Sequence, residues 1–302
     1  MKFTEVEDSI HHHVLLFGPP KSGKTELAGG LTTDFDLLLF DLERGAVTLR
    51  KLPKPQQERI NIISLPDTRS YPIAAETMLK VIRGTEQPIC VSHGKIRCSI
   101  CTKASAPFDV VHLNALPSST IVVVDSLTQL TNSLIAHITK EQDEMYKLLQ
   151  DDWGNLGKLM DTFLSHVQQA KFNIVCISHE TEVEMEDKTN KLVPTAGTRN
   201  FSRNTAKYFD EVIYVEVKNK KHIAASSTTY ANKILTGSRT GFRLEDMSGA
   251  ASLVPIFKGI VPQYHAGSER SKDTPAAISV DKLQAMRDRL AAANKPKLVK
   301  EE

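Results

Sequence analysis

Residues 18–25 constrain this chain more than any other segment, because they satisfy every fixed position of the phosphate-binding pattern G-x-x-x-x-G-K-[ST]. An apolar run at 14–17 precedes the motif, and residues 26–28 suit the start of a helix. Strand, loop and helix in this order distinguish a phosphate-binding loop from a chance glycine-rich turn. The segment therefore predicts an α/β fold built around a P-loop.

The residue types of this loop predict a site for ATP and Mg²⁺. Its glycines allow backbone N–H groups to turn toward phosphates, and the helix N-terminus adds the positive end of its dipole. We expect Lys24 to reach the β- and γ-phosphates and the Thr25 hydroxyl to bind Mg²⁺. The expected nucleotide-binding residues are Gly18, Pro19, Pro20, Lys21, Ser22, Gly23, Lys24, Thr25 and Glu26.

Composition places few limits on function. The chain has 302 residues, 25% charged and 40% hydrophobic, as is ordinary for a globular protein of one large or two small domains. A net charge of +2 does not indicate a nucleic-acid binder, although a local basic surface stays possible in principle. Apolar runs fall well short of the ~18 residues of a membrane helix, and the acidic start differs from a signal peptide. We therefore expect a cytoplasmic protein with no membrane partner.

Apolar runs alternate with helical patterns along most of the chain, which predicts a mostly parallel twisted sheet flanked by helices. The expected strands lie at 14–17, 37–41, 60–65, 121–125, 173–179, 210–217 and 230–235, and the expected helices at 71–83, 127–140 and 153–170. The polar stretch 180–200 is expected to be a loop or a hairpin. We expect an ATPase core at 1–265, a linker at 266–279, and a C-terminal helix and tail at 280–302, either tethered or docked on the core.

Two acidic residues follow strands that a P-loop fold brings to one edge. Asp125 ends an apolar strand, as expected for the Walker B carboxylate that orients Mg²⁺. Ser126 follows it where many ATPases have the water-activating glutamate, so another residue must supply that base. Glu43 lies just past the strand 37–41, and ligands gather at the carboxyl ends of parallel strands. The alternative is that Glu43 only pairs with Arg44 or another cation.

His179 ends the expected strand after Asp125 and would lie near the γ-phosphate. A hydrogen bond from its ring would suffice to sense whether that phosphate is present. The alternative is a loop histidine without a role in the site.

Four metal-binding residue types occur within twelve positions as C-x2-H-x4-C-x2-C, namely Cys90, His93, Cys98 and Cys101. These spacings and donors suit a closed, structural Zn²⁺ site, with His112 as the nearest substitute ligand. The segment interrupts the α/β pattern, which predicts an inserted zinc knuckle at 85–106. The alternative is three free cysteines and a surface histidine.

The placement of the P-loop, Glu43, Asp125 and His179 resembles the RecA-like ATPase core. More narrowly, residues 10–250 look like the phage-encoded RecA-like ATPases classed as single-strand annealing proteins. The resemblance rests on the P-loop and four shorter segments: D-x-E at 41–43, V-V-D-S at 123–126, S-H-E at 178–180 and T-x-x-R-x-G at 236–241.

This resemblance implies a catalytic set of Lys24, Glu43, Asp125, His179 and Arg239, with Arg239 reaching the γ-phosphate of a neighbouring subunit in a homo-oligomer. The alternative is that Arg239 is a hairpin arginine bound to a local carboxylate. It also implies that the loop after His179 binds single-stranded DNA. The basic candidates there are Lys188, Lys191, Arg199, Arg203 and Lys207, which could equally be ordinary surface charges. The C-terminal tail would bind a single-strand-binding protein.

The implied activity is that of a DNA-dependent ATPase that promotes annealing or strand exchange in homologous recombination. Two alternatives stay open. One is a nucleotide-gated single-strand DNA-binding or helicase-loading protein with little hydrolysis, and the other is a P-loop kinase.

Overall fold

A computed structural model describes residues 11–68, 71–143, 145–219, 221–225, 233–241 and 252–259. The chain divides into two compact units, Met1–Pro262 and Gln263–Glu302, and the fold below belongs to the first. The predicted linker at 266–279 and the predicted helix and tail at 280–302 lie outside the described residues.

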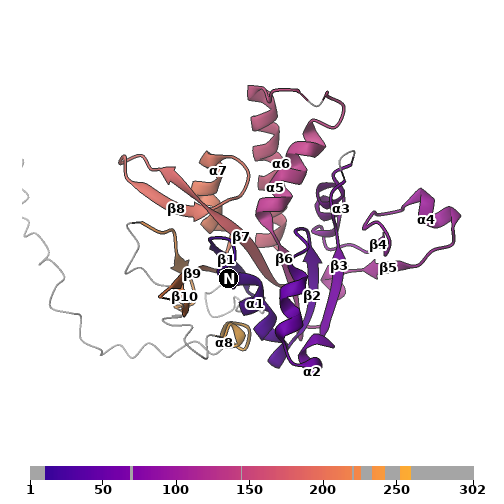
Figure 1. Cartoon of the computed structure of the whole chain (residues 1–302), viewed down its shortest axis with the longest axis horizontal. Coiled ribbons are helices and arrows are strands. Elements are labelled where there is room, and N and C mark those ends of the chain that lie inside the picture. The colour runs from indigo at the N-terminus through magenta and orange to yellow at the C-terminus, as the bar shows by residue number, and fades with distance from the viewer. Residues whose placement is uncertain are drawn as a thin grey trace, which may run out of the picture. The chain divides into compact units, whose positions relative to one another are not determined.

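The centre of the molecule is a nine-stranded, mostly parallel sheet (Figure 1). Its parallel strands are, in spatial order, β9 (Glu211–Lys218), β1 (His13–Gly18), β7 (Asn173–Glu184), β6 (Thr120–Asp125), β2 (Asp36–Asp41) and β3 (Ile60–Ser64). Three further strands are antiparallel: β10 (Lys221–Ala225) and β11 (Gly237–Ser238) on β9, and β8 (Asn190–Pro194) on β7. This architecture confirms the predicted α/β P-loop fold.

Both faces of the sheet are buried, because successive side chains of each strand point to opposite sides. In β1, Leu15 and Phe17 enter one core and Val14 and Leu16 enter the other. The first core is covered by α3 (Ile73–Val81), α5 (Leu127–Ile138) and α6 (Gln150–Gln168). The second is covered by α1 (Lys24–Gly29), the 3-10 helix η3 (Gly45–Lys51) and α8 (Val254–Phe257). Continuous apolar runs in the strands are the consequence of this double burial.

The shorter helices connect these layers or lie at the edges. They are η2 (Gly30–Thr33), α2 (Lys54–Gln57), α4 (Ser99–Lys103), η4 (Leu113–Ala115), α7 (Arg199–Asn204) and η5 (Thr205–Tyr208). Among the described residues, no helix is both long and apolar enough to cross a membrane.

The strand register brings the predicted polar residues to one edge of the sheet. Gly18 lies opposite His179, and Asp41 lies opposite Asp125. Because β1, β2, β6 and β7 run in the same direction, the segments that leave their carboxyl ends meet above that edge.

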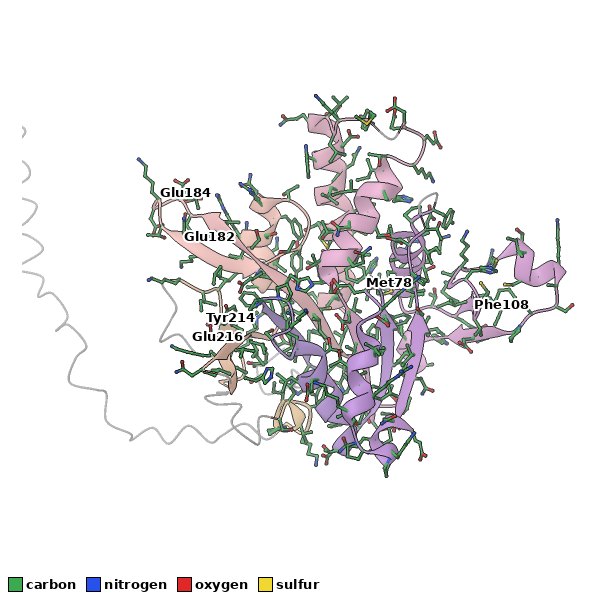
Figure 2. The ribbon with its side chains drawn as sticks, viewed as in Figure 1. Met78, Phe108, Glu182, Glu184, Tyr214 and Glu216 are labelled. Carbon is green, nitrogen blue, oxygen red and sulfur yellow. The ribbon has the colours of Figure 1, made fainter. Side chains whose placement is uncertain are left out.

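Strand β7 does not end at His179 as predicted but continues to Glu184. Its far half alternates, with Val183 buried and Glu182 and Glu184 exposed, so the polar residues lie on one face of a strand. This half pairs with β8 from Glu180 to Glu184. Figure 2 labels Glu182 and Glu184 on this projecting hairpin. The hairpin is one of the two forms predicted for residues 180–200.

The predicted strand at 230–235 is not found where the structure describes that segment. Within 233–235, Ile234 makes an isolated bridge to Leu192. The sheet edge is formed instead by β10, whose sequence K-H-I-A-A lacks the apolar run on which the strand predictions relied.

The segment that carries the Cys/His motif forms a small module of its own. Strands β4 (Gln87–Cys90) and β5 (Phe108–Val111) pair antiparallel in a separate two-stranded sheet, and α4 lies between them in the chain. Figure 1 shows this module extending beyond β3, and Figure 2 labels Phe108 on it.

Candidate functional site

The P-loop connects β1 to α1, and its local geometry favours glycine at two positions. A Cβ atom on Gly18 would lie 2.0 Å from the carbonyl oxygen of Val215, and Gly23 has a φ of 94°. Lys24 is buried behind the loop, where its Nζ donates to the carbonyl oxygens of Gly18 at 2.9 Å and Pro19 at 2.7 Å. Burial lowers the pKa of Lys24, and nearby carboxylates oppose that shift. The loop thus holds its lysine in place through its own backbone.

Thr25 and Asp125 offer two oxygen atoms to a metal ion. The Thr25 Oγ1 hydroxyl donates to Asp125 Oδ2 at 2.7 Å. The Asp125 side chain is 3% exposed, and burial raises its pKa to about 6, although the Thr25 hydrogen bond opposes this shift. A hydroxyl and a carboxylate oxygen are hard ligands of the kind Mg²⁺ prefers, so the pair fits Mg²⁺.

Glu43 is held from two sides. Its Oε1 accepts a hydrogen bond from the Ser126 hydroxyl, and its Oε2 lies 3.2 Å from His179 Nε2. Burial alone would raise the pKa of Glu43, but the hydrogen bonds from His179 and Ser126 outweigh it and the pKa is lowered. Glu43 is therefore an ionised carboxylate at neutral pH, able to accept a proton from a nearby water.

The turn that presents Glu43 is fixed by Asp41. Its carboxylate accepts from the backbone N–H of Gly45 at 2.9 Å and of Ala46 at 3.3 Å. Arg44, which lies between Asp41 and Gly45 in this turn, has a φ of 60°. This closed turn directs the main chain from β2 into η3 and leaves Glu43 facing the ends of β6 and β7.

These residues surround one cavity of about 320 Å³. From the predicted set, its lining includes Lys21, Ser22, Gly23, Lys24, Thr25, Glu26, Glu43, Asp125 and His179. Gly18, Pro19 and Pro20 do not line it; Gly18 and Pro19 instead supply the carbonyls that hold Lys24.

Five lining residues were not predicted: Gly45, Thr48, Lys51, Ile177 and His222. His222 comes from β10, and its Nδ1 donates to the carbonyl oxygen of Ser22 at 2.7 Å. No sequence signal marks it, because only the pairing of β10 with β9 brings it to the loop. The role of Ser126 was also missed, although its position after Asp125 was the available signal.

Residues 11–240 match the sequence profile of the AAA domain family. The chain belongs to the AAA domain family. A P-loop ATPase domain of this kind binds and hydrolyses ATP, which agrees with the cavity described above.

Among solved structures, this AAA domain protein is similar to a prototypical ATPase from the type III secretion system of pathogenic bacteria. The sequences are 12% identical, the match covers 82% of this chain and 58% of that chain, and the TM-score is 0.37. The chain thus spans less than two thirds of that structure. No match was found among curated protein sequences.

The predicted zinc ligands of the AAA domain protein lie together. The ligand atoms of Cys90, His93, Cys98 and Cys101 are all within 4.8 Å of one another. His93 Nδ1 lies 3.9, 3.7 and 3.2 Å from the sulfur atoms of Cys90, Cys98 and Cys101. A tetrahedral zinc ion, with bonds of about 2.3 Å to sulfur and about 2.0 Å to nitrogen, places such atoms about 3.5 Å apart. The cluster is therefore compatible with a zinc knuckle.

Local geometry supports the same reading. A backbone hydrogen bond with Cys101 lowers the pKa of Cys98 to about 6, whereas burial and the neighbouring thiols raise the pKa of Cys101 to about 11. The cluster thus favours one thiolate among its thiols. The turn between the ligands is anchored to α3, because Thr77 Oγ1 donates to the carbonyl oxygen of Gly94 at 2.7 Å. The Nζ of Lys95, in the same turn, lies 3.7 Å from the centre of the Tyr71 ring and makes a cation–π contact with it.

The predicted DNA-binding residues occupy the β7–β8 hairpin, helix α7 and the 3-10 helix η5. Lys188 lies in the turn between β7 and β8, Lys191 lies on β8, and Arg199 and Arg203 lie on α7. Lys191 and Arg203 line a common cavity of about 570 Å³. Lys207 does not line it; its Nζ lies 4.6 Å above the Tyr208 ring.

Arg239 lies far from the nucleotide cavity of its own chain. It follows β11, which pairs with the amino-terminal end of β9, whereas the P-loop lies at the carboxyl end of β1. Its guanidinium donates to Asp210 Oδ1 at 3.4 Å and to the carbonyl oxygen of Lys207 at 2.6 Å. Any contact of Arg239 with a nucleotide must therefore involve another subunit.

Proposed function

We propose that this AAA domain protein is a RecA-like, DNA-dependent ATPase that binds single-stranded DNA and promotes annealing or strand exchange. The observation that carries the proposal is the continuity of β7. His179 of β7 lines the nucleotide cavity. Strand β7 then continues without interruption into the β7–β8 hairpin, which carries Lys188 in its turn and Lys191 on β8.

Four side chains of the cavity and the loop backbone have distinct roles in this proposal. Lys24 and the loop backbone bind the triphosphate, and Thr25 and Asp125 hold Mg²⁺, which neutralises phosphate charge when bound. Glu43 accepts a proton from the water whose oxygen attacks the γ-phosphorus. The bond from that phosphorus to the bridging oxygen then breaks, so the products are ADP and phosphate.

The hydrogen bonds of His179 support coupling between the nucleotide cavity and bound DNA. Its Nε2 contacts Glu43, its backbone N–H donates to Thr128 Oγ1 at 2.9 Å, and its carbonyl accepts from Thr195 N at 2.8 Å. A γ-phosphate near His179 competes with Glu43 for the ring N–H. This competition would change the contacts of His179. His179 lies at the base of the hairpin, where β7 leaves the cavity and the chain after β8 returns to it.

Further parts of the proposal concern partners. We infer that Zn²⁺ bound at the Cys/His cluster stabilises the knuckle, that the protein forms homo-oligomers, and that Arg239 acts at a neighbour's nucleotide. Residues 280–302 would bind a single-strand-binding protein in the cytoplasm, which would be that of a bacterial host if the chain is phage-encoded.

ATP hydrolysis measured with and without single-stranded DNA tests the proposal. We expect DNA to stimulate wild-type turnover several-fold and Lys24→Ala to abolish turnover, since Lys24 is the P-loop lysine. Lys54→Ala, at an exposed position on α2, is the matched control and should behave as wild type.

The two other outcomes point elsewhere. DNA binding without turnover would favour the nucleotide-gated annealing or loading protein. Turnover that is indifferent to DNA would overturn the recombination function and favour a P-loop kinase or a loader.

A further inference from the structure

An open groove of about 980 Å³ lies beside the hairpin, between the start of α6 and the segment 197–200 that leads into α7. Its lining includes Trp153, the one tryptophan of the chain. Trp153 is 44% exposed. A large aromatic side chain that remains so exposed in a polar groove has apolar surface available to a ligand.

The other lining residues have the chemistry of a nucleic-acid site. Lys158 and Arg199 are cations, Asn155 and Asn200 carry amide groups that both donate and accept, and Asp151 is the one acidic residue among those that line the groove. Sites for single strands combine such cations, which bind phosphates, with an aromatic platform on which a base stacks.

We propose that this groove is a base-stacking site for single-stranded DNA, in which Trp153 stacks on a base and Arg199 and Lys158 bind flanking phosphates. This inference rests on the proposed function and adds α6 to the DNA-binding surface. Of its residues, only Arg199 belongs to the basic set predicted from the sequence.

The groove is joined to the nucleotide cavity through α5. The backbone N–H of Gly197, in the groove wall, donates to Thr131 Oγ1 at 2.9 Å. Thr128, about one turn earlier on the same helix, accepts from the backbone N–H of His179 at 2.9 Å. A base bound against residues 197–200 therefore contacts a segment held by the same helix as His179, which places DNA binding and the nucleotide site on one rigid element.

Intrinsic fluorescence tests the site directly, because the full chain has a single tryptophan. We expect a 30-nucleotide oligo(dT) to quench the emission of Trp153, and a blunt DNA duplex, whose bases are already stacked, to leave it unchanged. Anisotropy of a labelled oligo(dT) should show Trp153→Ala and Arg199→Ala binding about ten-fold more weakly than wild type, and Trp153→Phe retaining part of the affinity.

Val110→Ala is the matched control, since Val110 is an exposed apolar residue on β5, and its affinity should equal that of wild type. Circular dichroism of each variant shows that the fold is kept. Emission that is unchanged at saturating oligo(dT), equal quenching by duplex, or wild-type affinity in Trp153→Ala would overturn the stacking site while the proposed function stands. Failure of the wild-type protein to bind oligo(dT) at all would overturn both.

Discussion

Glu43 is the residue at which the turn after β2 meets strand β7. Its two oxygen atoms have different partners, the Ser126 hydroxyl and the His179 ring. Glu43 and His179 were each predicted from their positions after apolar strands, but their contact was not. A single sequence shows which strands end in polar residues, whereas strand order decides which of those residues touch.

His179 is expected to act through a hydrogen bond and not through its charge. We predict that His179→Gln, which keeps an N–H donor for Glu43, loses less than about three-fold in DNA-stimulated ATP turnover. His179→Ala should lose about ten-fold or more, because a hydrogen bond to a charged group is worth about 1.5–3 kcal/mol. Steady-state ATPase assays compare the two variants, and equal losses in both would contradict a hydrogen-bonding role.

The Asp125 carboxyl is expected to make the free energy of unfolding of the nucleotide-free protein depend on pH. Its pKa is raised by burial from 3.8 to about 6, so the folded state holds a proton that the unfolded state releases between these values. This contribution to stability is present at low pH and is lost as pH rises through 6. Asparagine imitates the protonated form, so we expect Asp125→Asn to gain about 2 kcal/mol more stability at pH 8 than at pH 4.

Urea unfolding of wild type and Asp125→Asn at the two pH values, without nucleotide or Mg²⁺, measures this difference. Thr25→Ala is a useful control, since it removes the hydrogen bond to Asp125 and leaves the buried carboxyl in place. An equal change in the free energy of unfolding at both pH values would show that the Asp125 carboxyl does not titrate as described.

At the scale of elements, the Cys/His module is a candidate zinc knuckle that packs against the main core through Ile89 and Val111. It has its own two-stranded sheet, and its buried cluster consists of Cys90, Cys98 and Cys101. We predict about one zinc ion per chain, lost in Cys98→Ser together with several degrees of thermal stability, while ATP binding is nearly unchanged. Elemental analysis, thermal unfolding and nucleotide titration provide the three readouts.

Cys176→Ala is the matched control for the knuckle. Cys176 is buried in β7 and lies outside the cluster, so this variant should keep any zinc that the wild type binds. A Cys98→Ser protein that retains full zinc content would refute the ligand assignment.

The elements predicted best are the strands whose sequences are mostly apolar. Strands β1, β2, β6 and the first half of β7 are buried on both faces, so their sequences are continuous apolar runs. Strand β10 and the outer half of β7 are polar, and they become strands because a neighbouring strand offers backbone partners. Such pairing depends on the tertiary structure and leaves no pattern in the sequence. For this reason the position of His222 at the P-loop could not be predicted.

At the scale of the whole molecule, the position of Arg239 provides a test of the proposed homo-oligomer. Because it lies at the end of β9 opposite the P-loop, it cannot reach its own nucleotide cavity. We expect Arg239→Ala to reduce ATP turnover at least about ten-fold. Mixing it with Lys24→Ala subunits should restore part of the activity, since an intact P-loop then meets an intact Arg239.

Turnover of the mixture is compared with the sum of the two separate variants. Mixing Arg239→Ala with wild-type subunits of equal total concentration controls for dilution. Activity no greater than that sum would exclude a role for Arg239 across an interface.

The unbroken course of β7 has a mechanical consequence. From His179 to Glu184 the strand advances five residues, or about 17 Å at ~3.3 Å per residue, and pairing with β8 stiffens it. A rotation of about 5° at His179 then displaces the far end by about 1.5 Å, which is enough to make or break a hydrogen bond there. The length of the hairpin thus determines how far a small change at the nucleotide cavity would move a residue of the proposed DNA-binding surface.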